Sequence, residues 1–305
     1  MYNFVVNKGS GKRRGEEYLQ KITEYCDARN IEYTVYQTNA KGHAEELTRN
    51  LCGEGADNVI AIGGDGTFHE ALNGLVTPES TRIGFIPAGR GNDFARAAHL
   101  SLKPVEAFGD ILRGDMKKID YIDCGGRRCL NVAGTGMDVD VLQAVINKKN
   151  TISYYVSLVN CLLHFKPYNV RITTSGKTIE KSCIMVGIGN GIAIGGGMLV
   201  SPHAKIDDGK LDLMIAEKLD RALLRILPKF IKGHHGELPE LTHLDVEEVE
   251  VENYGNPIQL DGEIYENVPL HCRIVKGGLN TYKVAADYKE VNDEREKIID
   301  EDISD

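Results

Sequence analysis

The stretch Val59-Ile-Ala-Ile-Gly-Gly-Asp-Gly-Thr-Phe-His-Glu70 decides how the first half of this chain folds. The apolar residues Val59–Ile62 predict a buried strand, which ends in the glycine-rich segment Gly63-Gly-Asp-Gly-Thr67. A helical pattern follows over Phe68–Leu75. Glycines let backbone amides approach a ligand closely, and the N-terminus of the following helix attracts anions. The turn therefore predicts a phosphate site.

Asp65 is unexpected in a phosphate site, because a carboxylate repels phosphate unless a cation lies between them. Its presence favours Mg²⁺-nucleotide as the ligand. The alternative is a tight strand-to-helix turn without a ligand, in which Asp65 caps the helix.

Composition limits the class of protein. The length of 305 residues is sufficient for two domains of ordinary size. The content of charged residues, 27%, and of hydrophobic residues, 42%, is typical of globular proteins. A net charge of −9 argues against nucleic acid as a partner. Seven scattered cysteines without metal-like spacing fit free thiols in a reduced compartment. No apolar run approaches the roughly 18 residues of a membrane span, so we expect a cytoplasmic protein.

The pattern of elements changes near residue 118. Before it, short strands alternate with helices, which predicts a parallel α/β sheet. The predicted strands are Tyr2–Asn7, Glu32–Gln37, Val59–Ile62 and Arg82–Ile86, and the helices are Glu16–Arg29, His43–Cys52 and Phe68–Leu75. After it, strands separated by turns predict an antiparallel sheet. These strands are Ile119–Cys124, Arg128–Ala133, Val170–Thr174, Thr178–Gly187, Lys210–Ala216, Leu244–Val251, Ile258–Leu260 and His271–Val275, with helices at Thr151–Phe165 and Leu219–Lys232.

The segments that follow the first four strands indicate a binding site, because ligands of open α/β sheets lie at the carboxyl ends of the strands. These segments are Asn7–Lys12, Thr38-Asn39, Gly63–Thr67 and Pro87–Phe94, and three of them are rich in glycine. Neither a Walker A pattern nor the G-x-G-x-x-G fingerprint is present at these positions.

Five motifs together resemble the diacylglycerol kinase catalytic-domain family, in particular its soluble bacterial lipid kinases. The motifs are Asn7…Ser10-Gly11, Gly63–Thr67, Pro87-Ala-Gly-Arg-Gly-Asn-Asp-Phe94, Asn131-Val-Ala-Gly-x-Gly136 and Asp208-Gly-x-Leu-Asp212, followed by Leu260-Asp-Gly-Glu263. The Gly-Gly-Asp-Gly-Thr turn alone is shared with NAD kinases and resembles the phosphofructokinase site. The Pro87–Phe94 element and the late Asp-Gly-Glu separate the lipid kinases from both. The resemblance covers residues 1–285.

The resemblance implies an N-terminal open α/β domain, similar to that of phosphofructokinase and NAD kinase, over residues 1–118. An antiparallel β-sandwich that holds the lipid follows over residues 119–282, and residues 283–305 return to the first domain. For the nucleotide it implies contacts from Asn7, Ser10, Gly11, Thr38, Gly63, Gly64, Asp65, Gly66, Thr67, Phe68, His69 and Arg90. Arg90 stands where the family usually has Thr or Ser, which leaves the hydroxyl contact open, although arginine can bind phosphate directly. Lys8 replaces the usual proline.

The resemblance also implies the catalytic carboxylates. Glu263 is the candidate general base, with Asp261 as its partner or as the alternative base. Asp120, eleven residues before Asn131, matches an aspartate that helps to organise the catalytic Mg²⁺. Without the family match, Asp261-Gly-Glu263 is also compatible with a plain hairpin turn, and Asp120 with a surface carboxylate at a strand end.

A second cation site is implied around Asp208, where similar bacterial proteins bind a structural Mg²⁺. Asp208 would be the side-chain ligand, together with the backbone carbonyls of Lys205 and Lys210. The alternative is a type I′ Asp-Gly hairpin turn without a metal.

The segment Leu219–His235 is a candidate for contact with the bilayer. Arg221, Arg225 and Lys229 recur every four residues among apolar side chains, as in basic helices that lie on anionic headgroups. The alternative is a helix that caps the sheet domain.

These observations predict an ATP- and Mg²⁺-dependent lipid kinase at the inner membrane face, with diacylglycerol as the leading acceptor and phosphatidic acid as the product. The alternatives are an NAD kinase-like enzyme and an inactive lipid-binding regulator. A homodimer is compatible with the sequence.

Overall fold

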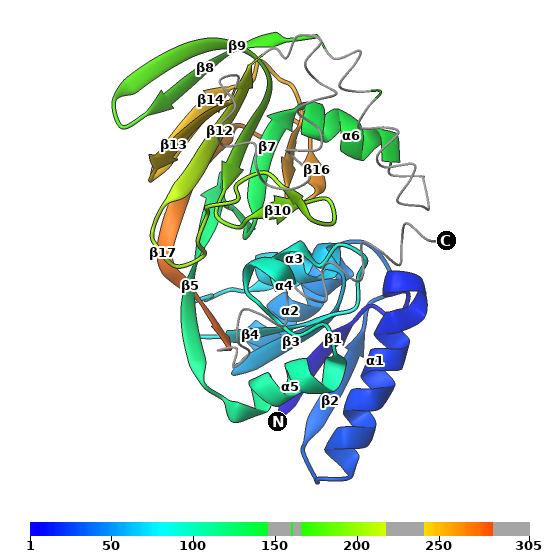
Figure 1. The fold of residues 1–305 in the computed structure, drawn as a ribbon. Helices are drawn as coiled ribbons and strands as arrows, with labels where there is room; N and C mark the ends of the chain where they lie inside the picture. The colour runs from blue at the N-terminus through cyan, green and yellow to red at the C-terminus, as the bar shows by residue number, and fades with distance from the viewer. Residues whose placement is uncertain (146–159, 161–165, 218–240, 283–305) are drawn as a thin grey trace. The chain divides into compact units, whose positions relative to one another are not determined.

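The structure is a computed structural model, which describes residues 1–145, 160, 166–217 and 241–282 (Figure 1). It divides into two compact units. Of the described residues, unit 1 contains 1–118 together with 279–282, and unit 2 contains those within Ile119–Gly278. The helices expected at Thr151–Phe165 and Leu219–Lys232, the basic segment Leu219–His235 and the return of residues 283–305 lie outside the described residues.

Unit 1 alternates strands and helices. Its elements are β1 (Tyr2–Val6), α1 (Ser10–Asp27), β2 (Tyr33–Gln37), α2 (His43–Gly53), β3 (Asn58–Gly63), α3 (Asp65–Gly74), β4 (Arg82–Pro87), α4 (Asp93–Ala97) and α5 (Pro104–Arg113). All pairings between β1, β2, β3 and β4 are parallel, in the order β4-β3-β1-β2. The order reverses between β1 and β3, and this switch point is where ligands bind in such sheets.

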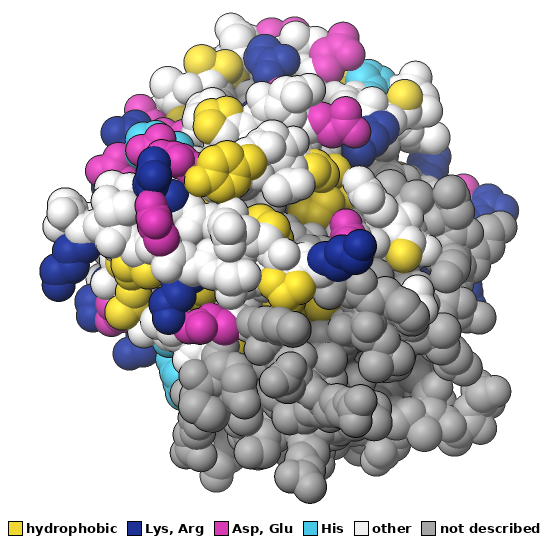
Figure 2. Space-filling view, turned by 90° about the horizontal axis from the view of Figure 1, so that it is seen from above, with side chains coloured by type: hydrophobic (Ala, Val, Ile, Leu, Met, Phe, Trp, Pro, Cys, Tyr) yellow, Lys and Arg dark blue, Asp and Glu magenta, His cyan; other side chains and the backbone are white. Residues whose placement is uncertain are grey.

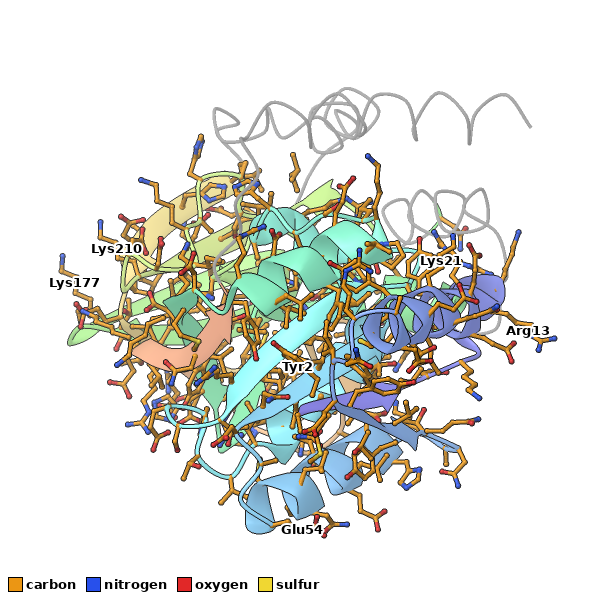
Figure 3. All side chains as sticks on the ribbon, turned by 90° about the horizontal axis from the view of Figure 1, so that it is seen from below. Tyr2, Arg13, Lys21, Glu54, Lys177 and Lys210 are labelled. Carbon is orange, nitrogen blue, oxygen red and sulfur yellow. The ribbon has the colours of Figure 1, made fainter. Side chains whose placement is uncertain are left out.

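The sheet of unit 1 is covered on both faces, as its strand sequences require. Alternate residues of β1 face opposite sides. Phe4 and Val6 pack with α1 and α5, whereas Val5 packs with α2. Figure 3 shows the exposed outer side of α1, where Lys21 pairs with Glu17. The two faces of the parallel sheet are thus covered by helices, which is the arrangement that the alternation of strands and helices along the sequence predicted.

The last strand of the described chain completes unit 1. The second half of β17 (Leu270–Tyr282) pairs in parallel with β4 through Thr281 and Ile83. Unit 2 therefore ends at Gly278, a few residues before the predicted boundary at residue 282.

Unit 2 consists mainly of strands. Its elements are β5 (Met116–Cys124), β6 (Arg127–Cys129), β7 (Val132–Gly136), α6 (Met137–Val145), β8 (Tyr168–Thr174), β9 (Lys177–Gly189), β10 (Ala193–Ile194), β11 (Met198–Leu199), β12 (Leu211–Glu217), β13 (Leu241–Val246), β14 (Glu248–Glu252), β15 (Ile258–Leu260), β16 (Glu263–Tyr265) and the first part of β17. Strand β9 is central, since it pairs antiparallel with β7, β8 and β12.

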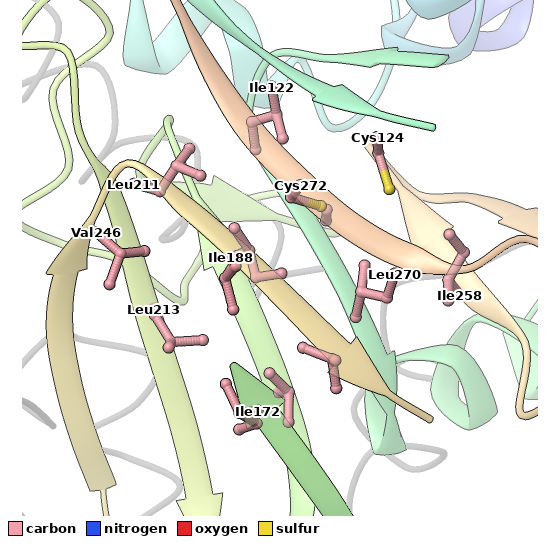
Figure 4. Packing of buried hydrophobic residues seen from close by; sticks show 14 of the residues in the cluster. Ile122, Cys124, Ile172, Ile188, Leu211, Leu213, Val246, Ile258, Leu270 and Cys272 are labelled. Atoms are coloured by element: carbon pink, nitrogen blue, oxygen red, sulfur yellow. The ribbon is translucent and has the colours of Figure 1, made fainter. Parts of the chain in front are cut away.

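The core of unit 2 is one cluster of apolar side chains that its strands contribute. Ile188, Leu211 and Leu213 are fully buried in one hydrophobic cluster (Figure 4). Ile172 and Leu270 belong to the same cluster. The residues pointing inward alternate with polar ones along β14, which is the pattern that predicted an antiparallel sheet, whereas β12 is buried continuously over residues 213–216.

Two predicted strands of unit 2 are divided in the structure. The expected strand Arg128–Ala133 is interrupted at Leu130-Asn131, because the amides of both residues donate to the carboxylate of Asp261 instead of to a neighbouring strand. The expected strand Leu244–Val251 is divided at Glu247, where β13 ends its pairing with β12 and β14 begins to pair with β17.

The described surface mixes both signs of charge. Figure 2 shows acidic and basic side chains interspersed on one face. Arg171 illustrates this mixture, because it pairs with Glu180 and Glu252. In the part of the chain that the structure describes, no helix has the length and apolar character that crossing a bilayer requires.

Candidate active site

The turn after β3 and the loop after β4 are in backbone contact. A Cβ on Gly89 would lie only 2.6 Å from the Cα of Gly64, so Gly89 requires glycine for this approach, and a Cβ on Gly64 would be in tight contact with Gly89 at 3.2 Å. A Cβ on Gly63 would collide with the side chain of Thr67 in the same way. The two glycine-rich segments therefore form one continuous backbone surface at the start of α3.

Asp65 joins these two loops. Its carboxylate accepts hydrogen bonds from the backbone N–H groups of Asn92 at 2.6 Å and Asp93 at 2.7 Å. Burial and the neighbouring Asp93 raise the pKa of Asp65 to about 7, while the two backbone donors act in the opposite direction. Asp65 thus orders the loop after β4, a role that differs from the helix cap considered as the alternative, because the donors belong to another helix.

The loop after β1 contacts the same turn. Asn7 Nδ2 donates to Thr67 Oγ1 at 3.4 Å, and Ser10 Oγ donates to the backbone oxygen of Asn7. Gly11 has a φ of +54°, and a Cβ there would lie 2.1 Å from the carbonyl oxygen of Ala88. The first, third and fourth loops are therefore brought together, as their positions after parallel strands predicted.

Arg14 also belongs to this site, although it was not among the predicted residues. Its Nη2 donates to the carbonyl oxygen of Gly89 at 2.6 Å, and its Nε donates to Gly11 at 3.2 Å. The basic run Lys12-Arg13-Arg14 was the available signal, but the sequence does not distinguish Arg14 from its neighbours. The structure does, since Arg13 pairs with the exposed Glu16.

The remaining predicted nucleotide residues have different surroundings. Thr38 hydrogen-bonds to Val6 at the end of β1. Phe68 stacks with Phe85 and with Phe94, and His69 is buried beside Asn73. The side chains of Phe68 and His69 thus belong to the interior of unit 1, whereas Arg90 is exposed and Gly66 lies in the first turn of α3.

In unit 2, Asp261 and Gly262 form the two-residue loop of the hairpin β15–β16. Their φ angles of +51° and +85° are those of a type I′ turn, for which Asp-Gly is a favoured sequence. The Asp261 carboxylate accepts from the N–H groups of Leu130 at 2.9 Å and Asn131 at 2.7 Å. Asp261 is therefore an anchor of the hairpin.

Glu263 is the first residue of β16 and is paired with Leu260 across the hairpin. It is half-buried. The plain hairpin considered from sequence is thus present, and it holds Glu263 immediately after a turn with two anchors, Asp261 and the side chain of Gln259, whose oxygen accepts from the Gly262 N–H at 2.9 Å.

Asp120 is buried inside β5, not at the surface end of a strand. Its carboxylate accepts from the N–H groups of Gly209 and Gly277, both at 2.7 Å. Asp120 consequently links its strand to the turn that contains Asp208, so these two predicted residues lie close together.

The turn at Asp208 contains oxygen atoms of the kind that bind a hard cation. Asp208 is exposed, as are Lys205 and Lys210, and its Oδ1 accepts from the Lys210 N–H at 3.0 Å. Carboxylate and carbonyl oxygens are typical Mg²⁺ ligands. Within the described ranges, no group of three or more His, Cys, Asp or Glu side chains is arranged to hold a metal, so a cation here would depend on backbone carbonyls and water.

Family models match both units of the chain. The diacylglycerol kinase catalytic domain matches residues 2–124, and the YegS C-terminal NAD kinase beta sandwich-like domain matches residues 131–283. The predicted fold class, an α/β domain followed by a β-sandwich, is thereby confirmed.

Several relatives span nearly the whole chain. A diacylglycerol kinase of Staphylococcus carnosus (strain TM300) is 27% identical over 285 residues, which are 91% of this chain and 93% of that protein. A diacylglycerol kinase of Bacillus subtilis (strain 168) is 27% identical over 85% of this chain and 88% of that protein. The crystal structure of a candidate diacylglycerol kinase from Bacillus anthracis str. Sterne superimposes with a TM-score of 0.77 at 25% identity, covering 92% of this chain and 96% of that one.

Proposed function

Since this chain belongs to the diacylglycerol kinase catalytic-domain family, a family of kinases with an alcohol acceptor, we propose that it transfers the γ-phosphoryl group of Mg²⁺-ATP to a hydroxyl of a membrane lipid. Diacylglycerol is the leading acceptor, and phosphatidic acid the product. The observation that carries the proposal is the joined backbone surface of Gly64 and Gly89, which lies at the carboxyl ends of β3 and β4, beside the switch point of unit 1.

The nucleotide phosphates would bind where α3 begins. Three glycines between Gly63 and Gly66 leave the backbone amides accessible, and the N-terminus of α3 favours negative charge. Asp65 supports this role indirectly, because its bonds to Asn92 and Asp93 hold the fourth loop against the turn before any ligand arrives. Arg90 would then contribute a positive charge from that loop.

Glu263 is the better candidate for the general base. A base must accept the proton of the lipid hydroxyl. The carboxylate of Asp261 accepts from Leu130 and Asn131, and Cys129 Sγ lies 3.1 Å from it. These contacts assign Asp261 to the positioning of the turn, and the resemblance of the Asp-Gly-Glu motif to that of the lipid kinases assigns Glu263 to proton transfer.

Mg²⁺ would neutralise charge on the phosphates during transfer. For a second, structural ion we propose Asp208 with the carbonyls of Lys205 and Lys210, beside Asp120. The lipid would be reached by peripheral contact from the cytoplasmic side of the membrane, for which the basic segment Leu219–His235 remains the candidate.

The experiment is a comparison of acceptors. The purified protein is incubated with γ-labelled ATP and Mg²⁺, with diacylglycerol micelles, sphingoid-base micelles or NAD as the acceptor. Label in phosphatidic acid is the expected result, whereas label in NAD alone would establish the NAD kinase-like alternative. Absence of label in every acceptor would favour the inactive lipid-binding regulator.

Two variants test the roles of the carboxylates. Glu263→Gln should lower kcat by about two to four orders of magnitude, the usual contribution of general-base catalysis, without lowering the free energy of unfolding. Asp261→Ala should lower both, since it leaves buried amides without an acceptor at a cost of about 1–3 kcal/mol each. Full activity of Glu263→Gln would remove this residue from the proposed role.

A further inference from the structure

Glu70 of α3 caps the N-terminus of a different helix, α2. Its carboxylate accepts hydrogen bonds from the backbone N–H groups of Gly42 at 2.7 Å and Ala44 at 3.1 Å. The first N–H groups of a helix have no acceptor within the helix, and the cap residue of α2 is Gly42, which has no side chain to supply one. Glu70 therefore provides the missing cap from another helix.

The loop after β2, residues 38–42, is held at both ends. At its beginning, the Thr38 N–H donates to the carbonyl oxygen of Val6 at 2.9 Å. At its end, the bonds to Glu70 attach the loop to α3. Since α3 begins directly after the glycine-rich turn of the candidate phosphate site, Glu70 connects the second of the four loops to the third.

Helices α2 and α3 also approach each other closely one turn after Glu70. A Cβ on Gly74 would lie 2.4 Å from the carbonyl oxygen of Glu45 and 2.7 Å from Thr48 Cβ, so this contact requires glycine. Because Gly74 follows Glu70 by four residues, both lie on the same face of α3. The carboxylate of Glu70 and the missing side chain of Gly74 thus belong to one contact with α2.

The carboxylate of Glu70 makes the N-terminus of α2 unsuitable for a phosphate. Two amides there already have an acceptor, and the negative charge of Glu70 repels anions. The N-terminus of α3 differs, since its own carboxylate, Asp65, bonds to the loop after β4, and its cap residue Gly64 has no side chain. Of these two helices, α3 is therefore the one that suits a phosphate.

We propose that Glu70 is a positioning residue for the nucleoside part of the nucleotide. It holds the loop after β2 on α3, so that Thr38 and Asn39 of this loop meet the sugar or the base while the phosphates bind at the start of α3. A hydroxyl and an amide side chain suit such uncharged polar groups, because each both donates and accepts hydrogen bonds. The role in nucleotide binding rests on the proposed function, whereas the cap on α2 does not.

Hydrogen exchange at Ala44 tests the cap without reference to a ligand. The chain contains two His-Ala pairs, His43-Ala44 and His203-Ala204, so protein labelled with carbonyl-¹³C histidine and ¹⁵N alanine gives one correlated amide signal for each. In Glu70→Ala, exchange at Ala44 should become faster by about tenfold or more, because its N–H loses a charged acceptor. Ala204 is the internal reference, since its N–H donates to a carbonyl oxygen in unit 2 and should exchange as in the wild type.

Two further variants control for charge and for folding. Glu46→Ala removes an exposed carboxylate from the same end of α2 and leaves the cap in place, so exchange at Ala44 should change by less than about fivefold. Glu70→Gln keeps the size of the side chain, but its NH₂ group cannot accept, so either Gly42 or Ala44 loses its acceptor. Gly42 is followed in protein labelled with carbonyl-¹³C lysine and ¹⁵N glycine.

Binding measurements test the role toward the nucleotide. Titration calorimetry with Mg²⁺-ATP and with Mg²⁺-tripolyphosphate separates the nucleoside part from the phosphates. In Glu70→Ala, the affinity for ATP should fall by about fivefold or more, because the loop after β2 loses two charged hydrogen bonds, and the affinity for tripolyphosphate should change by less than about twofold. Glu46→Ala should bind both compounds like the wild type.

Three results would overturn the proposal. Unchanged exchange at Ala44 in Glu70→Ala would remove the cap, and if that variant does not fold, wild-type exchange at both Gly42 and Ala44 in Glu70→Gln would do the same. An unchanged affinity for ATP would separate the loop from the nucleotide. An equal loss for ATP and tripolyphosphate would mean that Glu70 acts on the phosphates. A wild-type protein that binds ATP but labels no acceptor contradicts the proposed function alone, whereas binding of neither compound overturns both, and exchange at Ala44 still decides the cap.

Discussion

At the scale of single residues, the contact between Gly64 and Gly89 limits what the loops of unit 1 tolerate. Neither position needs an unusual backbone angle for this contact. What excludes a side chain is the backbone of the other loop, which cannot move away without losing the bonds from Asn92 and Asp93 to Asp65.

Gly89→Ala should therefore damage the nucleotide site. The added methyl group would overlap Gly64, with a loss of about 1–3 kcal/mol of stability and a rise in the KM for ATP of at least tenfold. The matched control is Gly109→Ala in α5, where an added Cβ meets no atom within 4 Å. That change should leave the KM unaltered and stabilise the protein slightly, because alanine favours the helix. Steady-state kinetics and urea unfolding measure both effects, and equal behaviour of the two variants would contradict the steric argument.

The raised pKa of the buried Asp138 carboxyl predicts that the stability of the protein depends on pH. Its ordinary pKa is 3.8 and its folded pKa is about 7, so between these values the folded protein holds one proton more than the unfolded chain. Because the folded protein binds this proton more tightly, the proton contributes to the free energy of unfolding. This contribution is fully present below pH 3.8 and is lost as the pH rises through 7. Asp138→Asn lacks the titration, so the free energy of unfolding of the variant minus that of the wild type should increase from pH 5 to pH 8. A difference that stays constant across urea unfolding curves at these pH values would show that Asp138 does not titrate there.

At the scale of elements, the start of α1 is organised by its contacts with the loop after β4. Gly11, Lys12 and Arg13 have positive φ angles, so regular helical geometry begins only at Arg14. Arg14 then reaches two carbonyl oxygens, those of Gly11 and Gly89. Arg14 of α1 thereby connects the loop after β1 to the loop after β4.

Arg14→Ala should weaken the connection between these two loops. Two hydrogen bonds from a charged donor contribute about 1.5–3 kcal/mol each, so we expect the KM for ATP to rise at least fivefold. The control is Arg13→Ala, whose exposed pair with Glu16 is worth less than about 1 kcal/mol. Steady-state kinetics with ATP measure the difference, and equal KM values of the two variants would rule out the role of Arg14.

At the scale of the whole molecule, unit 1 depends on residues far away in the sequence. Tyr282 is buried in the same cluster as Phe4 and Phe108, and Thr281 Oγ1 donates to the carbonyl oxygen of Ile83. The chain leaves unit 1 at Lys118 and comes back at Leu279, so unit 1 consists of two separate stretches of sequence, whereas unit 2 is one continuous stretch.

Tyr282→Ala should consequently destabilise the protein by about 3–5 kcal/mol, as expected for an aromatic side chain removed from a core. Tyr254→Ala is the control, because its side chain is 67% exposed in unit 2. Urea unfolding followed by circular dichroism compares the two variants. A loss below 1 kcal/mol in Tyr282→Ala, similar to the control, would mean that the last strand is not needed by unit 1.

Much of the fold could be predicted from local patterns. Ile258–Leu260 was predicted with its observed bounds, and Val59–Ile62 lies within β3, because apolar runs next to turn residues identify strands directly. Helix α5 was missed although Pro104 at its start and Gly114 at its end are ordinary signals. The break at Leu130-Asn131 could not be predicted, since its cause is a carboxylate more than a hundred residues later.

The sequence by itself determined the order of the strands and helices, the glycine-rich loops and the motifs that identify the family, because these depend on residue type and spacing along the chain. Only the tertiary structure decided what individual polar groups do. Asp65, Asp120 and Asp261 were predicted for metal and proton chemistry, and each one accepts hydrogen bonds from backbone amides of distant segments. The role of a carboxylate depends on which donors the fold brings to it, and those donors are backbone groups that every residue type except proline carries.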